Sequence, residues 1–248
     1  MNRSVCLFLS TTCLAALLTG GVTRPAHANP EGGVVSAGQA TITTSGKALD
    51  IHQQTNKAVI DWRGFDIGAD EITNFHQPGK DSITLNRVHS NSASQINGRL
   101  SANGNVVIVN QNGVVFGAGS QIDVHGLVAS TADIDNDRFM NDSQLRLDKA
   151  GKADARIINN GSITARDAGL VGFVAPNVEN NGIISARMGR VHLASGSTAT
   201  VDLYGDGLME VEVGKDVQSQ LVCSGVTIFR HSLAPFRSEY STANVRVS

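Results

Sequence analysis

The chain alternates short aliphatic segments with turns over most of its length. In residues 104–131, Val- and Ile-rich runs are separated first by Asn112-Gly113 and then by the sequence Gly-Ala-Gly-Ser. Short β-branched runs bounded by Gly and Asn are typical of strands, and residues that favour helices are scarce here. The pattern therefore predicts an all-β protein whose chain turns every few residues.

One kind of turn recurs with a regular spacing. Asn-Gly followed by a small or polar residue, an aliphatic residue, a polar residue and Ala occurs at residues 97–102, 160–165 and 181–186. The last two copies are 21 residues apart, and a period near 20 is a signature of solenoids. Because glycine tolerates positive φ, we expect these dipeptides to form structural corners. The corners are Asn97-Gly98, Asn160-Gly161 and Asn181-Gly182.

Two architectures can use such turns. Asn-Gly is a strong cue for two-residue hairpins, which would give a meander or a sandwich. Here, however, each Asn-Gly leads into a short strand and then into a different kind of turn, as in residues 160–175. This spacing favours a single-stranded parallel β-helix of about ten coils and about 45 Å in length.

Three segments depart from the repeat. We expect residues 30–60 to form strands that cap the first coil, since a β-rod has exposed ends. Residues 132–155 are charged and form a small extra-helical insertion, in which residues 140–149 are predicted to be a helical turn or a hairpin that protrudes from the rod. The pattern ends near residue 222, and residues 223–248 form an atypical tail.

The N-terminus has the features of a signal peptide. Arg3 precedes a mostly apolar run at residues 5–18, and Ala26-His27-Ala28 is a suitable cleavage site. We therefore expect residues 1–28 to be removed during export. The apolar run is too short to span a membrane, and no later segment is a candidate span.

Cleavage changes the charge and the cysteine content. The mature chain has 18 basic and 22 acidic residues, for a net charge of −4, which does not favour nucleic acid as a partner. Cys223 is its single cysteine, so no disulfide can form within it. We expect a monomer stabilised by burial and by backbone pairing.

Motifs for metals and cofactors are incomplete. Asp133, Asp135 and Asp137 have the spacing of a calcium loop, but Arg138 occupies the position of the turning glycine, which favours a solvated acidic loop. The histidines do not have zinc-ligand spacing. We therefore predict neither a metal nor a cofactor.

A glycan-active enzyme is an alternative, because parallel β-helices host such sites when carboxylates converge on one face. The densest acidic group, near Trp62, comprises Asp61, Asp66, Asp70 and Glu71. Trp62 could stack on a sugar. In the competing interpretation, Trp62 packs in the cap and the acids face solvent, so that the protein is not an enzyme.

Several ordered segments resemble the N-terminal secretion domain of filamentous haemagglutinin-type exoproteins, the passengers of two-partner secretion. The similarity extends over residues 33–222. The matching segments are residues 60–68, 73–75, 83–88, 94–98, 105–114 and 126–131.

The resemblance implies a right-handed parallel β-helix with an N-terminal cap. It also implies an export address that an outer-membrane barrel transporter recognises through its periplasmic receptor domains. The product would be secreted or displayed on a Gram-negative cell after a transient periplasmic stage. The family signature N-P-N-G-I maps onto Asn110, Gln111, Asn112, Gly113 and Val114. Gln111 replaces the proline, which removes its fixed φ but keeps the Asn-Gly corner.

A second family signature, N-P-N-L, is missing, and Gln77-Pro78-Gly79-Lys80 lies near its expected place. Family members usually continue into a long rod, so the tail at 223–248 suggests a truncated or naturally short product. The resemblance favours an exported recognition domain at residues 29–222. A self-contained surface adhesin is the main alternative, with a host-cell or glycan ligand left open.

Overall fold

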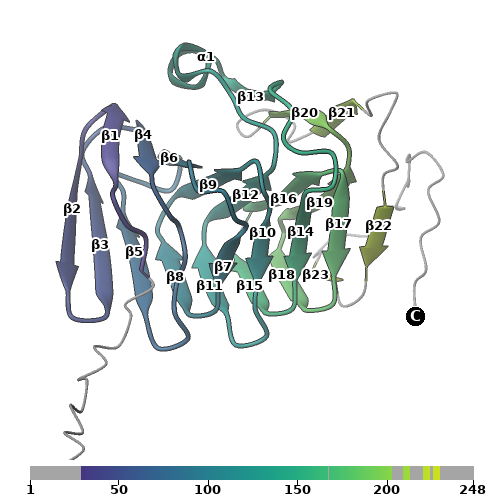
Figure 1. The fold of residues 1–248 in the computed structure, drawn as a ribbon, viewed down its shortest axis with the longest axis horizontal. Helices are drawn as coiled ribbons and strands as arrows, with labels where there is room; N and C mark the ends of the chain where they lie inside the picture. The colour runs from purple at the N-terminus through teal and green to yellow at the C-terminus, as the bar shows by residue number, and fades with distance from the viewer. Residues whose placement is uncertain (1–28, 167, 203–208, 213–219, 224–225, 230–248) are drawn as a thin grey trace, which may run out of the picture.

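The computed structural model describes residues 29–166, 168–202, 209–212, 220–223 and 226–229 (Figure 1). The predicted signal peptide lies outside this range, as does most of the predicted tail. Within it, three sheets of parallel strands run side by side along the molecule, and a smaller antiparallel sheet lies outside them. Successive coils of the chain contribute one strand to each parallel sheet in turn.

Sheet I is the longest of the three. Equivalent strands pair in parallel, for example Ser162 with Ile183 and Ile163 with Ile184. Its strands are β3 (Ala48–Gln53), β5 (Ile72–His76), β8 (Arg99–Ala102), β11 (Gln121–Val124), β15 (Ser162–Ala165), β18 (Ile183–Arg187) and β23 (Val226–Phe229), with β2 (Ala40–Ser45) antiparallel at the edge.

Sheet II follows sheet I in each coil, and sheet III completes the coil. Sheet II contains β4 (Lys57–Trp62), β6 (Ile83–Val88), β9 (Asn105–Asn110), β12 (Gly126–Ser130), β16 (Leu170–Ala175) and β19 (Arg190–Ser195), with β1 (Val34–Ala37) antiparallel at the edge. Sheet III contains β7 (Ser94–Ile96), β10 (Val114–Phe116), β14 (Arg156–Asn159), β17 (Asn177–Asn180) and β22 (Gln220–Cys223).

This topology confirms the predicted parallel β-helix, but the predicted number of coils was too high. Seven parallel strands of sheet I are described, whereas ten coils were expected. The coils differ in length. Arg99 pairs with Gln121, 22 positions on, and Gln121 pairs with Ser162, 41 positions on, because the second of these coils carries the insertion. The first two Asn-Gly repeats, which are 63 residues apart, are therefore separated by two coils.

The interior is filled by alternate residues of all three sheets. Inward aliphatic side chains stack on their counterparts in the next coil, as Ile163 does on Ile184, and both are fully buried. Phe116 and Phe173 stack within the same core with ring centroids 5.8 Å apart. Burial of these aliphatic rows supplies the main stabilisation of the rod, since the chain has few large rings.

The cap is smaller than predicted. Within residues 30–60, only β1 and β2 run antiparallel to the rod, while β3 and the larger part of β4 already belong to the first coil. Trp62 is buried beneath this end and donates its indole N–H to Asn86 Oδ1 at 3.0 Å. Phe65 meets its ring edge-on at 5.6 Å. This placement confirms the interpretation that Trp62 packs in the interior.

The three Asn-Gly dipeptides lie between strands of sheets III and I, and their glycines are not explained by a tolerance of positive φ. Among the described glycines with positive φ, none is Gly98, Gly161 or Gly182. Instead, a Cβ at Gly161 would lie 1.9 Å from Ser120 Oγ and 2.6 Å from the Gly117 carbonyl oxygen. The corners of successive coils are stacked so closely that no side chain fits between them.

Asparagine side chains join these corners. The buried Asn159 donates to Asn180 Oδ1 at 2.7 Å, one coil further on, and its own Oδ1 accepts from the Gly161 backbone N–H at 3.1 Å. Asn181 donates to Asn160 Oδ1 at 3.1 Å on the outer side. Asn159 therefore satisfies a backbone group of its own turn and links that turn to the neighbouring coil, while Asn181 and Asn160 link the two coils through their side chains.

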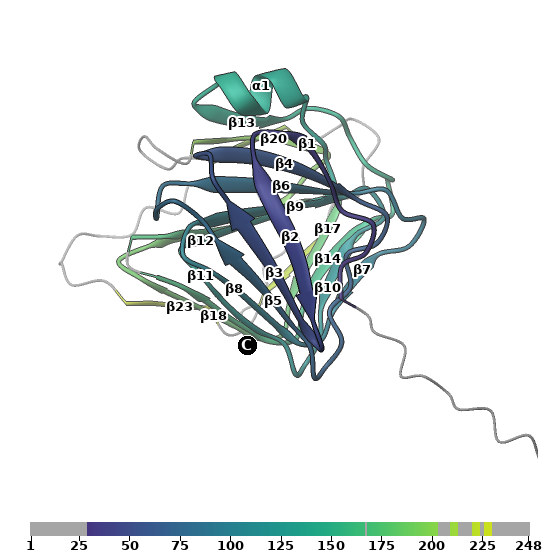
Figure 2. The same cartoon turned by 90° about the vertical axis from the view of Figure 1, so that its left-hand side faces the viewer.

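The insertion lies outside the rod as predicted, but it packs against the rod and does not stand free of it. Helix α1 (Asn136–Asn141) and the antiparallel strands β13 (Gln144–Leu147), β20 (Thr198–Asp202) and β21 (Met209–Glu212) lie over the outer face of sheet II (Figures 1 and 2). We call these four elements the lobe. Its buried residues, including Phe139, Leu145 and Leu147, form a second hydrophobic cluster with outward side chains of sheet II such as Leu85 and Val107. Strands of sheet II are thus apolar on both faces, as in a sheet that is covered on both sides.

Two basic residues of the rod hold the lobe in place. Lys57 donates to the carbonyl oxygens of Phe139 and Asp142 at 2.8 and 2.6 Å, at the C-terminal end of α1, where a cation is favourable. Arg87, whose side chain is only 13% exposed, bonds both carboxylate oxygens of Asp133 at 2.9 Å and also pairs with Asp61 at 3.3 Å.

These contacts correct the interpretation of the acidic segment as a solvated loop. Asp133 is bound by Arg87, and Asp135 caps α1 by accepting the Asp137 N–H at 2.9 Å. That backbone hydrogen bond lowers the pKa of Asp135 below its ordinary value. No described helix is long and apolar enough to cross a membrane.

The stacked corners yield a prediction. Gly161→Ala should lower the free energy of unfolding by about 1–3 kcal/mol, because the added methyl meets the backbone of the preceding coil. Gly79→Ala is the matched control, since a Cβ at Gly79 has no atom within 4 Å. Urea denaturation followed by circular dichroism measures both, and equal stability of the two variants would contradict the close-approach explanation.

The lobe yields a second prediction. Leu147→Ala should cost about 2–4 kcal/mol, because Leu147 is fully buried between β13 and sheet II. Arg146→Ala changes an exposed residue of the same strand and should have an effect within about 0.5 kcal/mol. If both variants unfold at the same urea concentration as the parent, the lobe is not a stabilising part of the fold.

Candidate functional site

The segment matching the N-P-N-G-I signature forms a tight corner between β9 and β10. The Gly113 N–H donates to the Asn110 carbonyl oxygen at 2.9 Å, which closes the turn. The Asn110 side chain holds it from inside, because its Oδ1 accepts the Asn112 N–H at 2.9 Å. Its Nδ2 donates to the Ser92 carbonyl and to Ser94 Oγ in the preceding coil, at 3.0 and 3.1 Å.

Glycine is required at position 113 for two reasons. Its φ is +115°, a conformation that residues with a Cβ rarely adopt. A Cβ there would also lie 2.5 Å from the Arg156 carbonyl oxygen of the next coil. The Asn-Gly pair therefore survives without the proline of the signature, because the turn is fixed by Asn110 and by the close approach of the next coil.

The five signature residues differ in what they present to a partner. Asn110, Gly113 and Val114 are buried, and Asn112 is half-buried with its amide donating to the Ser90 carbonyl at 2.8 Å. Gln111 alone of the five is exposed, while its carbonyl accepts the Lys152 N–H at 3.1 Å. The segment thus presents to a partner mainly a fixed backbone conformation and one outward side chain.

A cavity of about 290 Å³ lies beside this corner. Its lining includes Asn91, Asn112, Val115, Lys152 and Arg156. Lys152 comes from the end of the insertion, and no sequence pattern indicated that this segment returns next to the signature. The cavity lining combines apolar residues with three exposed charged side chains, those of Lys152, Arg156 and Asp154.

The place of the missing second signature is occupied by a buried hydrogen-bond network. Gln77 Nε2 donates to Thr84 Oγ1 and to the Asn105 carbonyl at 3.1 and 3.0 Å, and its Oε1 accepts the Gly104 N–H at 2.9 Å. Asn103 bonds the backbone of Gln77 at both its N–H and its carbonyl, each at 2.7 Å. The role of Gln77 was not predicted from the sequence, because a lone Gln before Pro has no distinctive pattern.

The carboxylates considered for catalysis serve local structure. Asp61 pairs with Arg87 and His89. Burial raises the pKa of Asp61, but hydrogen bonds from Ser36, His89 and Arg87 together outweigh burial and lower the pKa below its ordinary value. The other three are held separately: Asp66 accepts the Gln95 N–H at 2.7 Å, Asp70 pairs with Lys47, and Glu71 accepts the Gly68 N–H at 2.9 Å.

Comparison with known proteins agrees with this geometry. Residues 26–226 match the model of the TPS secretion domain, the two-partner secretion domain. The chain belongs to this family. The solved HMW1 secretion domain of Haemophilus influenzae has the same fold, with a TM-score of 0.72 and 30% identity, over 80% of this chain and 53% of that one.

Curated relatives of this secretion domain are two heme/hemopexin-binding proteins of Haemophilus influenzae. One, from strain ATCC 51907 / DSM 11121 / KW20 / Rd, is 35% identical over 215 residues, which are 84% of this chain and 24% of the relative. The other is 39% identical over 131 residues, 53% of this chain and 14% of the relative. The chain thus spans about a quarter or less of these relatives. The two-partner secretion family predicted from the sequence is confirmed.

The corner of the secretion domain gives a third prediction. Gly113→Ala should destabilise the domain by about 1–3 kcal/mol through backbone strain, whereas Gln111→Ala should leave its stability within about 0.5 kcal/mol, because that side chain is exposed. Thermal unfolding measures both. A fully stable Gly113→Ala variant would mean that the turn does not need positive φ.

Proposed function

We propose that residues 29–222 act as the export address of a two-partner secretion exoprotein. After removal of residues 1–28 in the periplasm, a dedicated outer-membrane barrel transporter recognises the chain through its periplasmic receptor domains. The corner formed by residues 110–114, placed on a fold shared with the HMW1 secretion domain, is the observation that carries this proposal. Its role in recognition is the backbone shape that Asn110 and Gly113 fix, together with the exposed Gln111.

Strand pairing provides a mode of recognition. An extended segment can add to an open sheet edge of a partner, and this contact relies on main-chain hydrogen bonds. The alternating segments of this chain suit such pairing before they stack on one another. The receptor domains of the transporter would supply the edge.

Folding outside the cell follows from the same architecture. Each coil offers the next one a ready edge of N–H and C=O groups, so coils can form in the order in which they emerge. The low cysteine content fits passage of an extended chain, since a cross-linked chain could not thread a narrow barrel. We propose a secreted or cell-surface destination in a Gram-negative bacterium.

Deletion of Asn112-Gly113 provides the fourth prediction. In cells that contain the cognate transporter, this variant should accumulate in the periplasm, because the corner that the receptor reads is lost. Cell fractionation and immunoblotting measure its distribution.

Deletion of Asn181-Gly182 is the control, because it removes the same dipeptide from a later corner outside the signature. This control should still reach the outside of the cell, although its rod is damaged. Normal release of the Asn112-Gly113 deletion, or equal retention of the two deletions, would refute the role assigned to residues 110–114.

A further inference from the structure

The outer face of sheet II is apolar over its first four parallel strands. Register partners on β4, β6, β9 and β12 are Val59, Leu85, Val107 and Val128, and each is at most 2% exposed. They belong to the hydrophobic cluster that the lobe completes. Without the lobe these outward side chains would face water, which is unfavourable.

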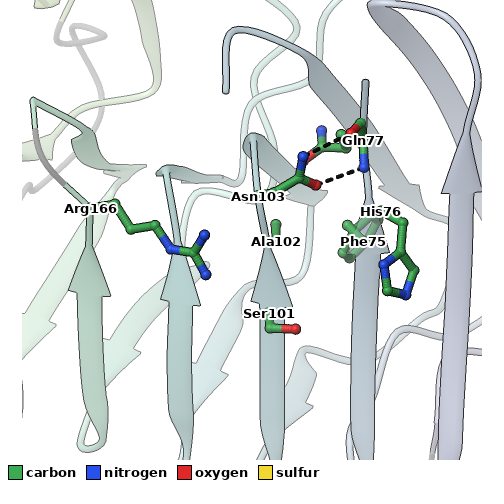
Figure 3. Close-up of a pocket in the computed structure, with 7 residues that line it drawn as sticks. All are labelled: Phe75, His76, Gln77, Ser101, Ala102, Asn103 and Arg166. Atoms are coloured by element: carbon green, nitrogen blue, oxygen red, sulfur yellow. Dashed lines mark hydrogen bonds between the residues drawn. The ribbon is translucent and has the colours of Figure 1, made fainter. Parts of the chain in front are cut away.

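The outer face of sheet I has a different character. Figure 3 shows His76, Ser101 and Arg166 on this face, where they line a cavity of about 350 Å³. The side chains of His76 and Arg166 are 52% and 48% exposed. Polar outward side chains can remain in water, so a coil of this kind does not need a cover on every face. The lobe therefore answers a feature of sheet II alone.

The inserted part of the lobe is closed at its base. Asp133 and Lys149 form an antiparallel bridge, with backbone N–H to C=O hydrogen bonds of 2.8 and 3.0 Å. The segment between them contains α1 and β13 and can form as a local unit of the fourth coil, because its ends are already held together. In the part of the chain that the structure describes, β13 pairs with β20 and with no other strand.

The lobe connects the first two coils to the sixth. Lys57 of the first coil donates to two backbone carbonyls at the end of α1, and Arg87 of the second coil donates to the Ile134 carbonyl at 2.6 Å. On the other side, β20 follows β19 of the sixth coil and pairs with β13. Ala199 and Val201 of β20 are at most 5% exposed within the cluster. The sixth coil is thus held by its neighbours and also by the lobe.

We propose that the lobe is a clasp that stops the rod from unwinding from its C-terminal end. In a simple solenoid each coil is held only by its neighbours, so the last coils open most easily. Here the sixth coil cannot leave the fifth unless β20 also leaves β13. The sixth coil and the lobe therefore open together, as one cooperative unit.

The order of the chain gives the clasp a direction. During export of the kind proposed above, the insertion would emerge with the fourth coil, and β20 would emerge only after β19 of the sixth. Pairing of β13 with β20 would then keep the coils that have formed outside from unwinding again. This consequence rests on the proposed function, whereas the clasp itself is a property of the folded domain.

Native-state hydrogen exchange of the purified mature chain, followed residue by residue by NMR, tests the clasp. The readout is the set of amides in β18, which belongs to sheet I of the sixth coil and not to the lobe. In the parent, these amides should share one opening free energy with those of β13 and β20. Leu147→Ala weakens the contact of β13 with sheet II and should speed exchange in β18 at least about tenfold.

A matched pair of variants in the first coil provides the sharper test. Lys57→Met keeps the apolar stem but removes the two hydrogen bonds to the lobe, so it should speed exchange in β18 about fivefold, although β18 lies five coils away. Ile51→Val trims a fully buried side chain of the inner core in the same coil. It should change exchange in β18 less than about twofold, because the first coil stays folded when the clasp opens.

Two results would overturn the clasp. If Lys57→Met speeds exchange only within the lobe, the lobe is a local cover that does not hold the sixth coil. If Lys57→Met and Ile51→Val speed exchange in β18 equally, the domain opens as a whole and the lobe is not a separate unit. Both variants are mild enough to fold, which circular dichroism verifies. These measurements use the folded domain, so their failure leaves the export address at residues 110–114 untouched.

Discussion

Parallel, in-register pairing of equivalent strands in successive coils is the constraint on which the rest of the structure depends. In a rod of this kind, the backbone groups of one coil are satisfied by the coils on either side of it. The coils must therefore stay in contact around their whole circumference, including the corners. This explains why Gly161 and Gly182 lie against the backbone of the preceding coil and why Asn159 and Asn180 bond each other within the stack. The corner at Asn110 likewise stays in contact with the neighbouring coils.

The lobe adds contacts between coils that are not neighbours in the rod. A simple solenoid has only nearest-neighbour contacts between coils. Here β13 leaves the fourth coil and pairs with β20 from the sixth, while Lys57 of the first coil bonds the end of α1, 82 positions along the chain. These bonds tie distant coils together and cover the apolar outer face of sheet II. In the export model, coils could form one after another, but this face would be covered only after β20 had emerged.

The sequence predicted the features that follow from periodicity, and it missed those that follow from packing. The 21-residue spacing of Asn160-Gly161 and Asn181-Gly182 was enough to infer parallel coils. Equivalent residues of β15 and β18 pair at the same spacing of 21 positions, so the sequence repeat gives the strand register directly. The placement of residues 132–155 was not predictable in this way. Its charged residues suggested solvent exposure, whereas Asp133 is half-buried against Arg87, a partner 46 positions away.

The candidate site shows the same division. The signature located the corner at residues 110–114, but the fold determines that Gln111 is the exposed one of these five residues and that Lys152 returns beside them. The neighbours on the outer face of sheet I were not predictable for a similar reason. His52, His76 and Arg166 look scattered along the chain until the register of four strand pairs brings them onto one face.

Cysteine cross-linking between coils is the most direct measurement of the stacked-coil architecture. In a background with Cys6, Cys13 and Cys223 replaced by Ser, Thr164→Cys and Ser185→Cys occupy partner positions on β15 and β18. Their Cα atoms should lie about 5 Å apart, within the range for a disulfide, so mild oxidation should join them. Thr164→Cys with Arg187→Cys, two positions out of register, should remain reduced. Efficient cross-linking of the second pair but not of the first would contradict the parallel register and the fold built on it.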